Sequence, residues 1–324
     1  MKAAVVTRYG PPEVVEVRDV PPPVPAGDEV VVRVHASTVS FGDRMLRSGP
    51  LLVRLLNGLA KPKQPILGVD FSGTVEAVGG AVTRFAPGDE VFGSRGGRFG
   101  AHAELVCVAE NGFLARKPRN MSFDEAATLF VGAACPLFFL RKARLRAGDE
   151  VLVHGASGSL GVFAVQLAKH FGARVTGVCG PTNGELVRQL GADAVIDYTT
   201  RDFTAGGAIY DVIVDVLGKA GFPRSLRALK PGGRYLLIGF SGGLLSIIGC
   251  MLAGAWAHVR GIAKFTAGAA APVPADLELL RELVEAGELR TVIGGSYALE
   301  HIVDAYRHAD TGHKIGSVVV RIPS

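Results

Sequence analysis

A strand, a glycine-rich turn and a helix follow one another in the segment 151–173, VLVHGASGSLGVFAVQLAKHFGA. The apolar strand stops at His154, and Gly155, Gly158 and Gly161 precede an amphipathic helix. Glycines at this spacing allow a tight turn, close approach of a pyrophosphate to the backbone, and close packing of the helix on the strand. The N–H groups and dipole at the helix N-terminus then attract the phosphates. Because a second strand pattern follows, the segment predicts a dinucleotide site rather than a turn without a ligand.

The end of that second strand favours NADPH over NADH. NAD sites place an acidic residue about 20 residues after the first glycine, where it binds the ribose hydroxyls. Here the strand RVTGV is followed by CGPTN at 179–183, and Glu185 comes later, as a first-turn helix residue would. The candidate partners of a 2′-phosphate are Tyr198, Arg188 and Arg201, although each of them, taken individually, is better explained as a solvated surface residue. We therefore expect NADPH as the cofactor.

Strand and helix patterns alternate from Ser122 onward, which predicts a parallel sheet with helices on both faces. Ser122 followed by Glu125 is typical of a helix capping box. In such sheets ligands bind beyond the carboxyl ends of the strands, so the expected cofactor residues follow successive strands. They are Gly155, Ala156, Ser157, Gly158, Ser159, Leu160, Gly161, Cys179, Gly180, Thr182, Asn183, Tyr198, Val216, Leu217, Gly239 and Phe240.

The first part of the chain has a different pattern. Short runs with a two-residue period, broken by Gly and Pro, predict a barrel or sandwich, which the segment 51–64 interrupts as a short helix or flap. After Gly268 two helix patterns and the strand GSVVVRI are expected to rejoin this first domain. The predicted limits are 1–121 and 270–324 for one domain and 122–269 for the other.

Composition excludes several other classes. With 324 residues, 48% hydrophobic and 20% charged, the chain can bury two cores. Its net charge of +5 is scattered, which argues against a nucleic-acid stripe, and its four cysteines are too far apart for a disulfide framework or a zinc lobe. The apolar run 244–257 is shorter than the about 20 residues of a membrane span, so we expect a buried or interfacial segment without stable membrane insertion. No apolar signal core opens the chain, and a cytoplasmic location is the default expectation.

The motifs together resemble the medium-chain dehydrogenase/reductase superfamily, and within it the zinc-free quinone oxidoreductase branch. The resemblance covers nearly the whole chain and includes HGASGSLGVFAVQLAK, LGADAVIDY, LKPGGRYLLIG, ILGVDFSGTVEAVG and APGDEVFG. It implies a GroES-like β-barrel catalytic domain made from both termini and a central Rossmann domain. It also implies an active site in the cleft between them.

The same resemblance bears on metal binding. Zinc alcohol dehydrogenases place a Cys in the segment aligned with VHASTVSFGD and a His-Glu pair in that aligned with LGVDFSG. This chain has Ser40 at the first position and Val69 and Asp70 at the second, and 95–112 contains only Cys107. Without the soft sulfur and nitrogen ligands we expect no zinc. Three further histidines are interpreted as packing or surface residues: His35, His102 and His154.

Zinc-free relatives often carry an Asn at the position of Ser40, an Asp at that of Asp43, a Tyr near Met45 and a Thr at the position of Ala134. This chain keeps only the Asp. The catalytic candidates are Ser40, as a hydrogen-bond donor to a substrate carbonyl, and Asp43, which could order the loop with Arg44 or Arg47. The alternative is a purely structural ion pair between Asp43 and Arg47.

The resemblance implies hydride transfer from NADPH to a quinone, enone or similar conjugated acceptor. The expected apolar walls of the substrate site are Phe41, Met45, Leu46, 51–60 and 244–257. Two alternatives stay open: an alcohol dehydrogenase or carbonyl reductase, and a non-catalytic NADPH-binding regulatory protein, which the missing Tyr and Thr favour.

A homodimer is expected, in which an edge strand near Val259–Phe265 pairs with its copy. The alternative is that 244–257 folds back as a lid and covers this edge within one chain.

Overall fold

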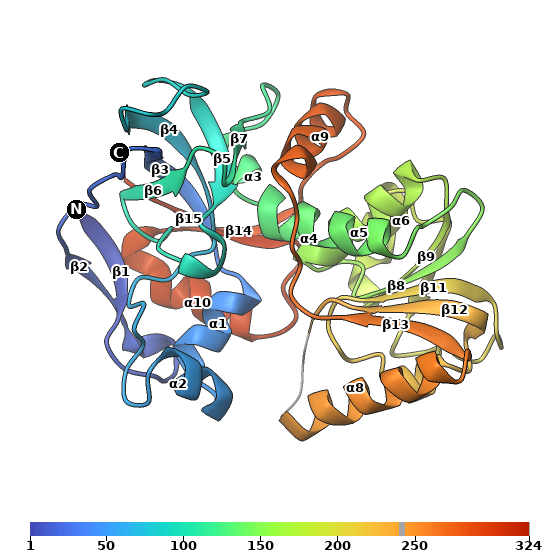
Figure 1. The fold of residues 1–324 in the computed structure, drawn as a ribbon. Helices are drawn as coiled ribbons and strands as arrows, with labels where there is room; N and C mark the ends of the chain where they lie inside the picture. Colours follow the sequence, from blue (N-terminus) through green and yellow to red (C-terminus); the bar gives the residue numbers. More distant parts are fainter. Residues whose placement is uncertain (240–243, 324) are drawn as a thin grey trace. The chain divides into compact units, whose positions relative to one another are not determined.

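The structure is a computed structural model that describes residues 1–239 and 244–323, and only the backbone of 244–248 (Figure 1). The chain divides into two compact units. Unit 1 contains Met1–Val131, Val273–Gly287 and Thr291–Ser324, and unit 2 contains Gly132–Pro272 and Glu288–Arg290.

Unit 2 is built on a six-stranded sheet in the order β10-β9-β8-β11-β12-β13, in which every neighbouring pair is parallel. The strands in chain order are β8 (Glu150–His154), β9 (Arg174–Cys179), β10 (Ala194–Asp197), β11 (Tyr210–Asp215), β12 (Leu229–Leu237) and β13 (Ala263–Ala267). The first strand of the series, β8, lies in the middle, and the chain moves outward first on one side and then on the other. This order is that of a Rossmann sheet, and the prediction of a doubly wound parallel sheet is confirmed.

Helices cover both faces of this sheet (Figure 1). They are α4 (Cys135–Lys142), α5 (Ser159–His170), α6 (Gly184–Gln189), α7 (Phe222–Ser225) and α8 (Leu244–Val259), with a 3-10 turn η4 (Pro181–Asn183). Of these, α7 is only four residues long. An aromatic cluster lies on one face of this sheet, where the ring centroids of Phe222, Tyr235 and Phe265 are 5.0–5.9 Å apart.

Unit 1 contains a seven-stranded sheet in the order β14-β15-β3-β4-β5-β7, with β6 paired to β3, and a separate antiparallel pair of β1 and β2. Its strands are β1 (Lys2–Val6), β2 (Val15–Asp19), β3 (Glu29–Thr38), β4 (Asp70–Val78), β5 (Glu90–Ser94), β6 (Leu105–Ala109), β7 (Phe113–Arg116), β14 (Ile293–Ala298) and β15 (Ser317–Arg321). Its helices are α1 (Phe41–Ser48), α2 (Leu51–Asn57), α3 (Phe123–Ala126), α9 (Pro274–Glu285) and α10 (Ile302–Asp310), with short 3-10 turns at Pro12–Val14, Gly96–Arg98 and Leu299–His301.

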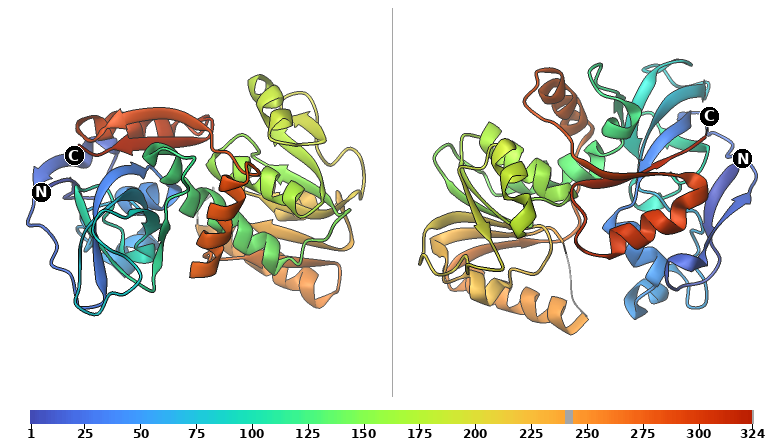
Figure 2. Two further views of the ribbon diagram at one scale, coloured as in Figure 1. Left: turned by 90° about the horizontal axis from the view of Figure 1, so that it is seen from above. Right: turned by 180° about the vertical axis from the view of Figure 1, so that it is seen from behind.

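The C-terminal strand pairs with a strand from the N-terminal part of the chain. Strand β15 pairs antiparallel with β3, and Val320 lies opposite Ser37 in the register. Figure 2 shows the C-terminal strands from two further sides. Strand β14, with the sequence IGGSYA, was not predicted because its two adjacent glycines obscure the strand pattern. It pairs in parallel with β15 and so extends the same sheet.

The expected strand at Val259–Phe265 begins four residues later. Helix α8 contains no Asp, Glu, Lys or Arg and ends at Val259, and Gly261, with a φ of +67°, forms a left-handed turn after it. The N–H groups of Gly261 and Ile262 bond back to the last helical carbonyls, as in a Schellman motif. The strand β13 therefore occupies Ala263–Ala267, at the edge of the sheet.

A continuous helical stretch, Phe123–Lys142, is long and apolar enough to cross a membrane by length and composition alone. It begins at the predicted capping box, where Ser122 and Glu125 exchange hydrogen bonds, and contains a π-helical turn at Phe130–Ala134. Because 67% of its most apolar window is buried within the protein, it has the burial of a core helix.

Candidate functional site

The glycine turn after β8 contains two positions that accept only glycine. Gly155 has a φ of +89°, and a Cβ atom there would lie 2.7 Å from the Leu217 side chain. A Cβ atom on Gly161 would lie 2.1 Å from the carbonyl oxygen of Gly155, so the helix α5 packs directly on the turn. These contacts give Gly155 and Gly161 the roles of tight turn and close packing.

Gly158 differs from the other two glycines because space is available around it. It has ordinary extended backbone angles, and a Cβ atom there would have only the Gly155 oxygen nearby, at 3.5 Å. Gly158 is also the N-cap of α5, and it provides no side chain to cap the first helical turn. The amino end of this twelve-residue helix is therefore open to an anion.

The other expected cofactor residues surround the same edge of the sheet. The Asn183 amide donates to the Ser157 hydroxyl at 3.2 Å, and the Tyr198 N–H donates to the Cys179 carbonyl at 3.2 Å. The Val216 N–H donates to the carbonyl oxygen of His154, which ends β8. Gly239 follows β12, and its N–H donates to the carbonyl of Asp215 at 3.4 Å. Phe240 lies outside the described residues.

Not every expected residue offers a side chain to a ligand. Ala156, Cys179 and Val216 are buried, at most 4% exposed, and present only their backbone groups at this edge. Thr182 and Tyr198 are exposed on the following loops. The remaining members, Ser159, Leu160 and Gly180, lie in the first turn of α5 and directly after β9.

Asp197 is a residue that the linear pattern did not indicate. It ends β10 and lies beside Cys179 in the register of β9 and β10, although β9 itself ends without an acidic residue. The carboxylate oxygen Oδ1 accepts hydrogen bonds from the N–H and the hydroxyl of Thr199, at 2.9 and 2.8 Å. A carboxylate is therefore near the end of β9, but it is engaged in its own turn. The exposed Arg201 lies on the same loop.

A second unexpected residue, Asp215, organises the loop after β11. Its side chain is fully buried, and the Nδ1 atom of His154 lies 3.5 Å from its Oδ1 atom. Burial by itself would raise the pKa of Asp215, but His154, Tyr235 and backbone donors outweigh it and lower the pKa. Its oxygens accept hydrogen bonds from the Tyr235 hydroxyl and from the N–H groups of Leu217, Gly218 and Ala220. A buried anion thus holds the loop that faces Gly155.

In unit 1 the catalytic candidates Ser40 and Asp43 form a capping box at the start of α1. The Ser40 hydroxyl donates to Asp43 Oδ2 at 2.6 Å, and the Ser40 N–H donates to the same oxygen at 2.8 Å. The other oxygen, Oδ1, accepts the N–H of Gly68 at 2.7 Å. Asp43 therefore orders this loop by itself, and the hydroxyl proton of Ser40 is directed to Asp43.

The expected pairing of Asp43 with an arginine is wrong. Arg47 is 2% exposed and instead donates to Asp310 and to the carbonyl of Gly10, with its guanidinium 5.2 Å from the centre of the Tyr306 ring. Arg44 also lies nearest Asp310, at 3.5 Å. The carboxylate of Asp43 is already satisfied by short-range donors of its own loop, and α10 brings Asp310 to both arginines.

Asp70 lies close to this loop, at the start of β4, and is 1% exposed. Its Oδ2 atom accepts hydrogen bonds from the Thr38 hydroxyl at 3.0 Å and from the Val131 N–H at 3.4 Å. Its Oδ1 atom has no partner among the described residues. Burial raises the pKa of Asp70 well above the usual carboxyl range. In the sequence, Asp70 is notable only because it stands where zinc alcohol dehydrogenases carry a metal ligand.

The three histidines are integrated into the fold. His102 is fully buried and lies 3.1 Å from the Thr38 carbonyl through Nε2, so this nitrogen is the donor, and burial lowers the pKa of its ring. His35 is half-buried and pairs with Thr74, and His154 faces Asp215. His102 is a packing residue, as predicted. Among residues 1–239 and 244–323, no three His, Cys, Asp or Glu side chains are grouped as metal ligands.

Comparison with protein families matches residues 26–119 to the alcohol dehydrogenase GroES-like domain and residues 190–320 to the zinc-binding dehydrogenases. The chain is 32% identical to a quinone oxidoreductase of Sus scrofa, over 98% of this chain and 95% of that protein. It is 30% identical to a 2-methylene-furan-3-one reductase of Solanum lycopersicum, over 99% of this chain and 79% of that protein.

The solved structure of the quinone oxidoreductase from Coxiella burnetii has a TM-score of 0.88 and 29% identity with this chain, covering 100% of it and 99% of that structure. The predicted combination of a GroES-like domain with a Rossmann-type parallel sheet is therefore confirmed.

Proposed function

Because the chain belongs to the medium-chain dehydrogenase/reductase superfamily, in its quinone oxidoreductase-like branch, we propose that it is a zinc-independent reductase of quinones, enones or similar conjugated carbonyl compounds that uses NADPH. The observation that carries this proposal is the glycine turn. Gly155 and Gly161 leave no room for a side chain, whereas Gly158 leaves the amino end of α5 open to a pyrophosphate.

The residues of this edge fit a dinucleotide. The first turn of α5 would hold the pyrophosphate, and the loop from Val216 to Ala220, held by Asp215, would contact the far end of the cofactor. Bound there, the cofactor supplies the hydride, while the protein provides binding, orientation and electrostatics. The missing carboxylate at the end of β9 supports NADPH, because an acid at that position would repel a 2′-phosphate. Asp197 is close, but its Oδ1 atom is engaged by Thr199.

On the substrate side we assign Ser40 and Asp43 the task of holding the loop that presents the acceptor. The Ser40 hydroxyl can donate to a substrate carbonyl only after it leaves Asp43, so its first role is as a positioning residue. Apolar side chains suit a conjugated acceptor, and the exposed ones nearby in the sequence are Phe41, Leu51, Leu52, Leu55 and Leu56. The relative from Solanum lycopersicum is named as a reductase of such an acceptor, a carbonyl conjugated to a methylene group.

Cofactor oxidation at 340 nm with a panel of quinones, enones, aldehydes and ketones tests the proposal. We expect turnover of the conjugated compounds, no stoichiometric zinc by elemental analysis and no loss of rate with EDTA. Turnover of simple aldehydes or ketones alone would favour an alcohol dehydrogenase or carbonyl reductase. Tight NADPH binding without any turnover would favour a regulatory protein.

We also propose a homodimer. Strand β13 pairs with β12 and with no other strand in the described part of the chain, and α8 packs on the face of the sheet through Gly254 and Phe265. Leu252, Trp256 and Val259 of α8 remain more than half exposed. Light scattering at micromolar concentration should give about 68 kDa, twice the 33.9 kDa chain. A mass of one chain would refute the dimer.

A further inference from the structure

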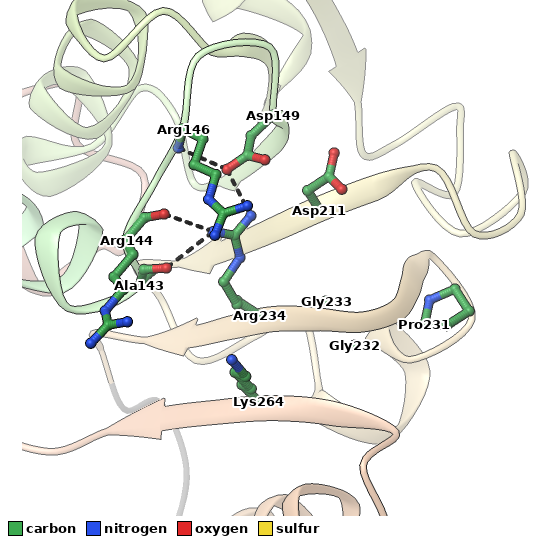
Figure 3. Close-up of a pocket in the computed structure, with 10 residues that line it drawn as sticks. All are labelled: Ala143, Arg144, Arg146, Asp149, Asp211, Pro231, Gly232, Gly233, Arg234 and Lys264. Carbon is green, nitrogen blue, oxygen red and sulfur yellow. Dashed lines mark hydrogen bonds and ion pairs between the residues drawn. The ribbon is translucent and has the colours of Figure 1, made fainter.

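A pocket of about 300 Å³ lies in unit 2 at the amino ends of the parallel strands (Figure 3). It is lined by the loop before β8, by the beginning of β11 and β12, and by Lys264 of β13. The glycine turn follows the opposite end of the same strands, since β8 runs from Glu150 at the pocket side to His154 at the turn. The pocket is therefore separate from the cofactor edge.

Four cationic side chains line this pocket: Arg144, Arg146, Arg234 and Lys264. Arg234 and Lys264 are register partners on the adjacent parallel strands β12 and β13, so their side chains leave the same face of the sheet. The neighbouring pair in that register, Tyr235 and Phe265, stacks on the other face at 5.9 Å. Strands are about 4.8 Å apart, and like charges placed side by side at this spacing destabilise a sheet.

The two carboxylates that line the pocket, Asp149 and Asp211, already accept hydrogen bonds from other residues. Asp149 accepts Arg234 Nη2 at 2.7 Å and the N–H of Arg146 at 2.9 Å. Asp211 accepts Lys230 Nζ at 2.7 Å and the N–H of Glu150 at 2.9 Å. These contacts fix the pocket walls but leave the other cations without an acidic partner.

Arg234 is a wall of the pocket, whereas the remaining cations are available. Its Nη1 atom donates to the carbonyls of Ala143 and Arg144 at 3.0 Å each, which holds the loop in place (Figure 3). Arg144 is exposed, and its φ of +52° is unusual for a residue with a side chain. The side chains of Arg144, Arg146 and Lys264 make no hydrogen bond or ion pair with residues 1–239 or 249–323.

We propose that this pocket binds a phosphate or diphosphate group of a small phosphorylated molecule, at a site distinct from the cofactor site. Guanidinium groups match phosphate oxygens in geometry as well as charge, and Lys264 adds a further cation from the edge strand. The bound anion would give Arg144, Arg146 and Lys264 the acidic partner that Asp149 already provides for Arg234. A volume of about 300 Å³ lies at the lower limit of small-molecule sites, which suits a compact phosphorylated ligand.

Calorimetric titration of the full chain with pyrophosphate tests this site, with inorganic phosphate as the second probe. We expect saturable binding of one pyrophosphate that persists in the presence of saturating NADPH and in Gly158→Asp. The variants Arg144→Gly and Lys264→Gln should each weaken this binding at least tenfold. Arg144→Gly is suitable because glycine adopts a positive φ without strain, so the loop should keep its conformation.

Arg227→Gln is the matched control, since Arg227 is an exposed arginine of the same unit that does not line the pocket. It should bind pyrophosphate as the unchanged protein does. The proposal would be overturned if pyrophosphate showed no saturable binding. It would also be overturned if Arg144→Gly and Lys264→Gln bound pyrophosphate as tightly as Arg227→Gln does. Loss of pyrophosphate binding in Gly158→Asp would assign it to the glycine turn instead, which also overturns the proposal. Pyrophosphate binding is measured directly, so it can be interpreted even if the protein neither binds NADPH nor turns over a substrate.

Discussion

Two carboxyl groups, Asp215 in unit 2 and Asp70 in unit 1, are buried to the same degree and yet have opposite properties. Both are at most 1% exposed; Asp215 is the last residue of β11 and Asp70 is the first residue of β4. The pKa of Asp215 is lowered and that of Asp70 is raised. Asp215 receives four hydrogen bonds through both oxygens, whereas Asp70 receives two through one oxygen.

The difference shows that burial does not determine the charge of an acid. Removing a carboxylate from water disfavours its anion, and only nearby hydrogen-bond donors or positive charges reverse this effect. The loop after β11 directs three backbone N–H groups at Asp215, and the anion in turn holds that loop. At Asp70 no donor reaches Oδ1 within the described residues, so the neutral acid is favoured. In unit 2 a buried anion holds a loop, whereas in unit 1 the raised pKa of Asp70 favours the protonated acid.

The largest expected effect comes from adding a carboxylate at the amino end of α5, where backbone N–H groups are open to an anion. Gly158→Asp places a negative charge at the amino end of α5, in a position with room for the side chain. NADPH binding should weaken by about a thousandfold, equivalent to about 4 kcal/mol, because the charge and the side chain compete with the pyrophosphate. Calorimetry measures the affinity, and circular dichroism checks the fold.

Gly80→Asp is the control for this substitution, because Gly80 also has open space and ordinary backbone angles but lies in unit 1. It should bind NADPH normally. Tight binding by Gly158→Asp would show that the turn does not hold the phosphates.

The next effect concerns the stability of unit 2. Asp215→Asn removes the charge and one acceptor oxygen while the donors remain, and should lower the free energy of unfolding by about 2 kcal/mol at pH 7. Because the pKa of Asp215 is lowered in the folded state, its contribution is present above the unfolded carboxyl pKa of about 4 and is lost as the pH falls through the folded value. Urea unfolding from pH 7 down to pH 3 measures both effects.

The exposed carboxylate Asp202, which pairs with Arg224 in the same unit, provides the comparison variant Asp202→Asn. Asp202→Asn should lower the free energy of unfolding by clearly less than Asp215→Asn does. If the two substitutions destabilise the protein equally at pH 7, the buried hydrogen-bond network around Asp215 adds no more stability than an exposed ion pair.

Cofactor preference is expected to be a more modest effect. NADPH should bind at least tenfold more tightly than NADH, a difference of about 1.4 kcal/mol, since β9 ends without an acid. Asp197→Asn tests whether the neighbouring strand opposes this preference, because it removes the nearby charge and leaves the size of the side chain unchanged. Fluorescence titration of both cofactors gives the ratio, and equal affinities in the unchanged protein would contradict the expectation.

The smallest effect is expected at Asp70, at acidic pH. Asp70→Asn replaces a neutral acid by a neutral amide of the same size and should change the free energy of unfolding by less than about 1 kcal/mol at pH 4. The raised pKa of Asp70 means that the unchanged protein loses stability as the pH rises from about 4 through the folded value. Relative to it, Asp70→Asn should therefore become more stable with rising pH. The opposite trend would mean that Asp70 is an anion in the folded protein.

Several features of this protein could be read from the sequence because they depend on neighbours along the chain. The glycine turn after β8 requires glycine where φ is positive or where the backbone approaches itself, and both conditions lie within seven residues. The capping box of Ser122 and Glu125 is likewise local. The alternation of strands and helices from Ser122 onward predicted the parallel sheet, since parallel strands need crossover connections.

Other features depend on which segments the fold brings together. Asp310 is 263 residues from Arg47 in the chain and reaches it only because α10 packs in unit 1. Asp197 lies beside Cys179 because β10 pairs with β9, although the linear pattern of β9 shows no acid. The pKa of a buried acid is likewise a feature that depends on which segments the fold brings together. Asp215 and Asp70 are the same residue type, and the donors and charges that folding assembles around each of them shift their pKa values in opposite directions.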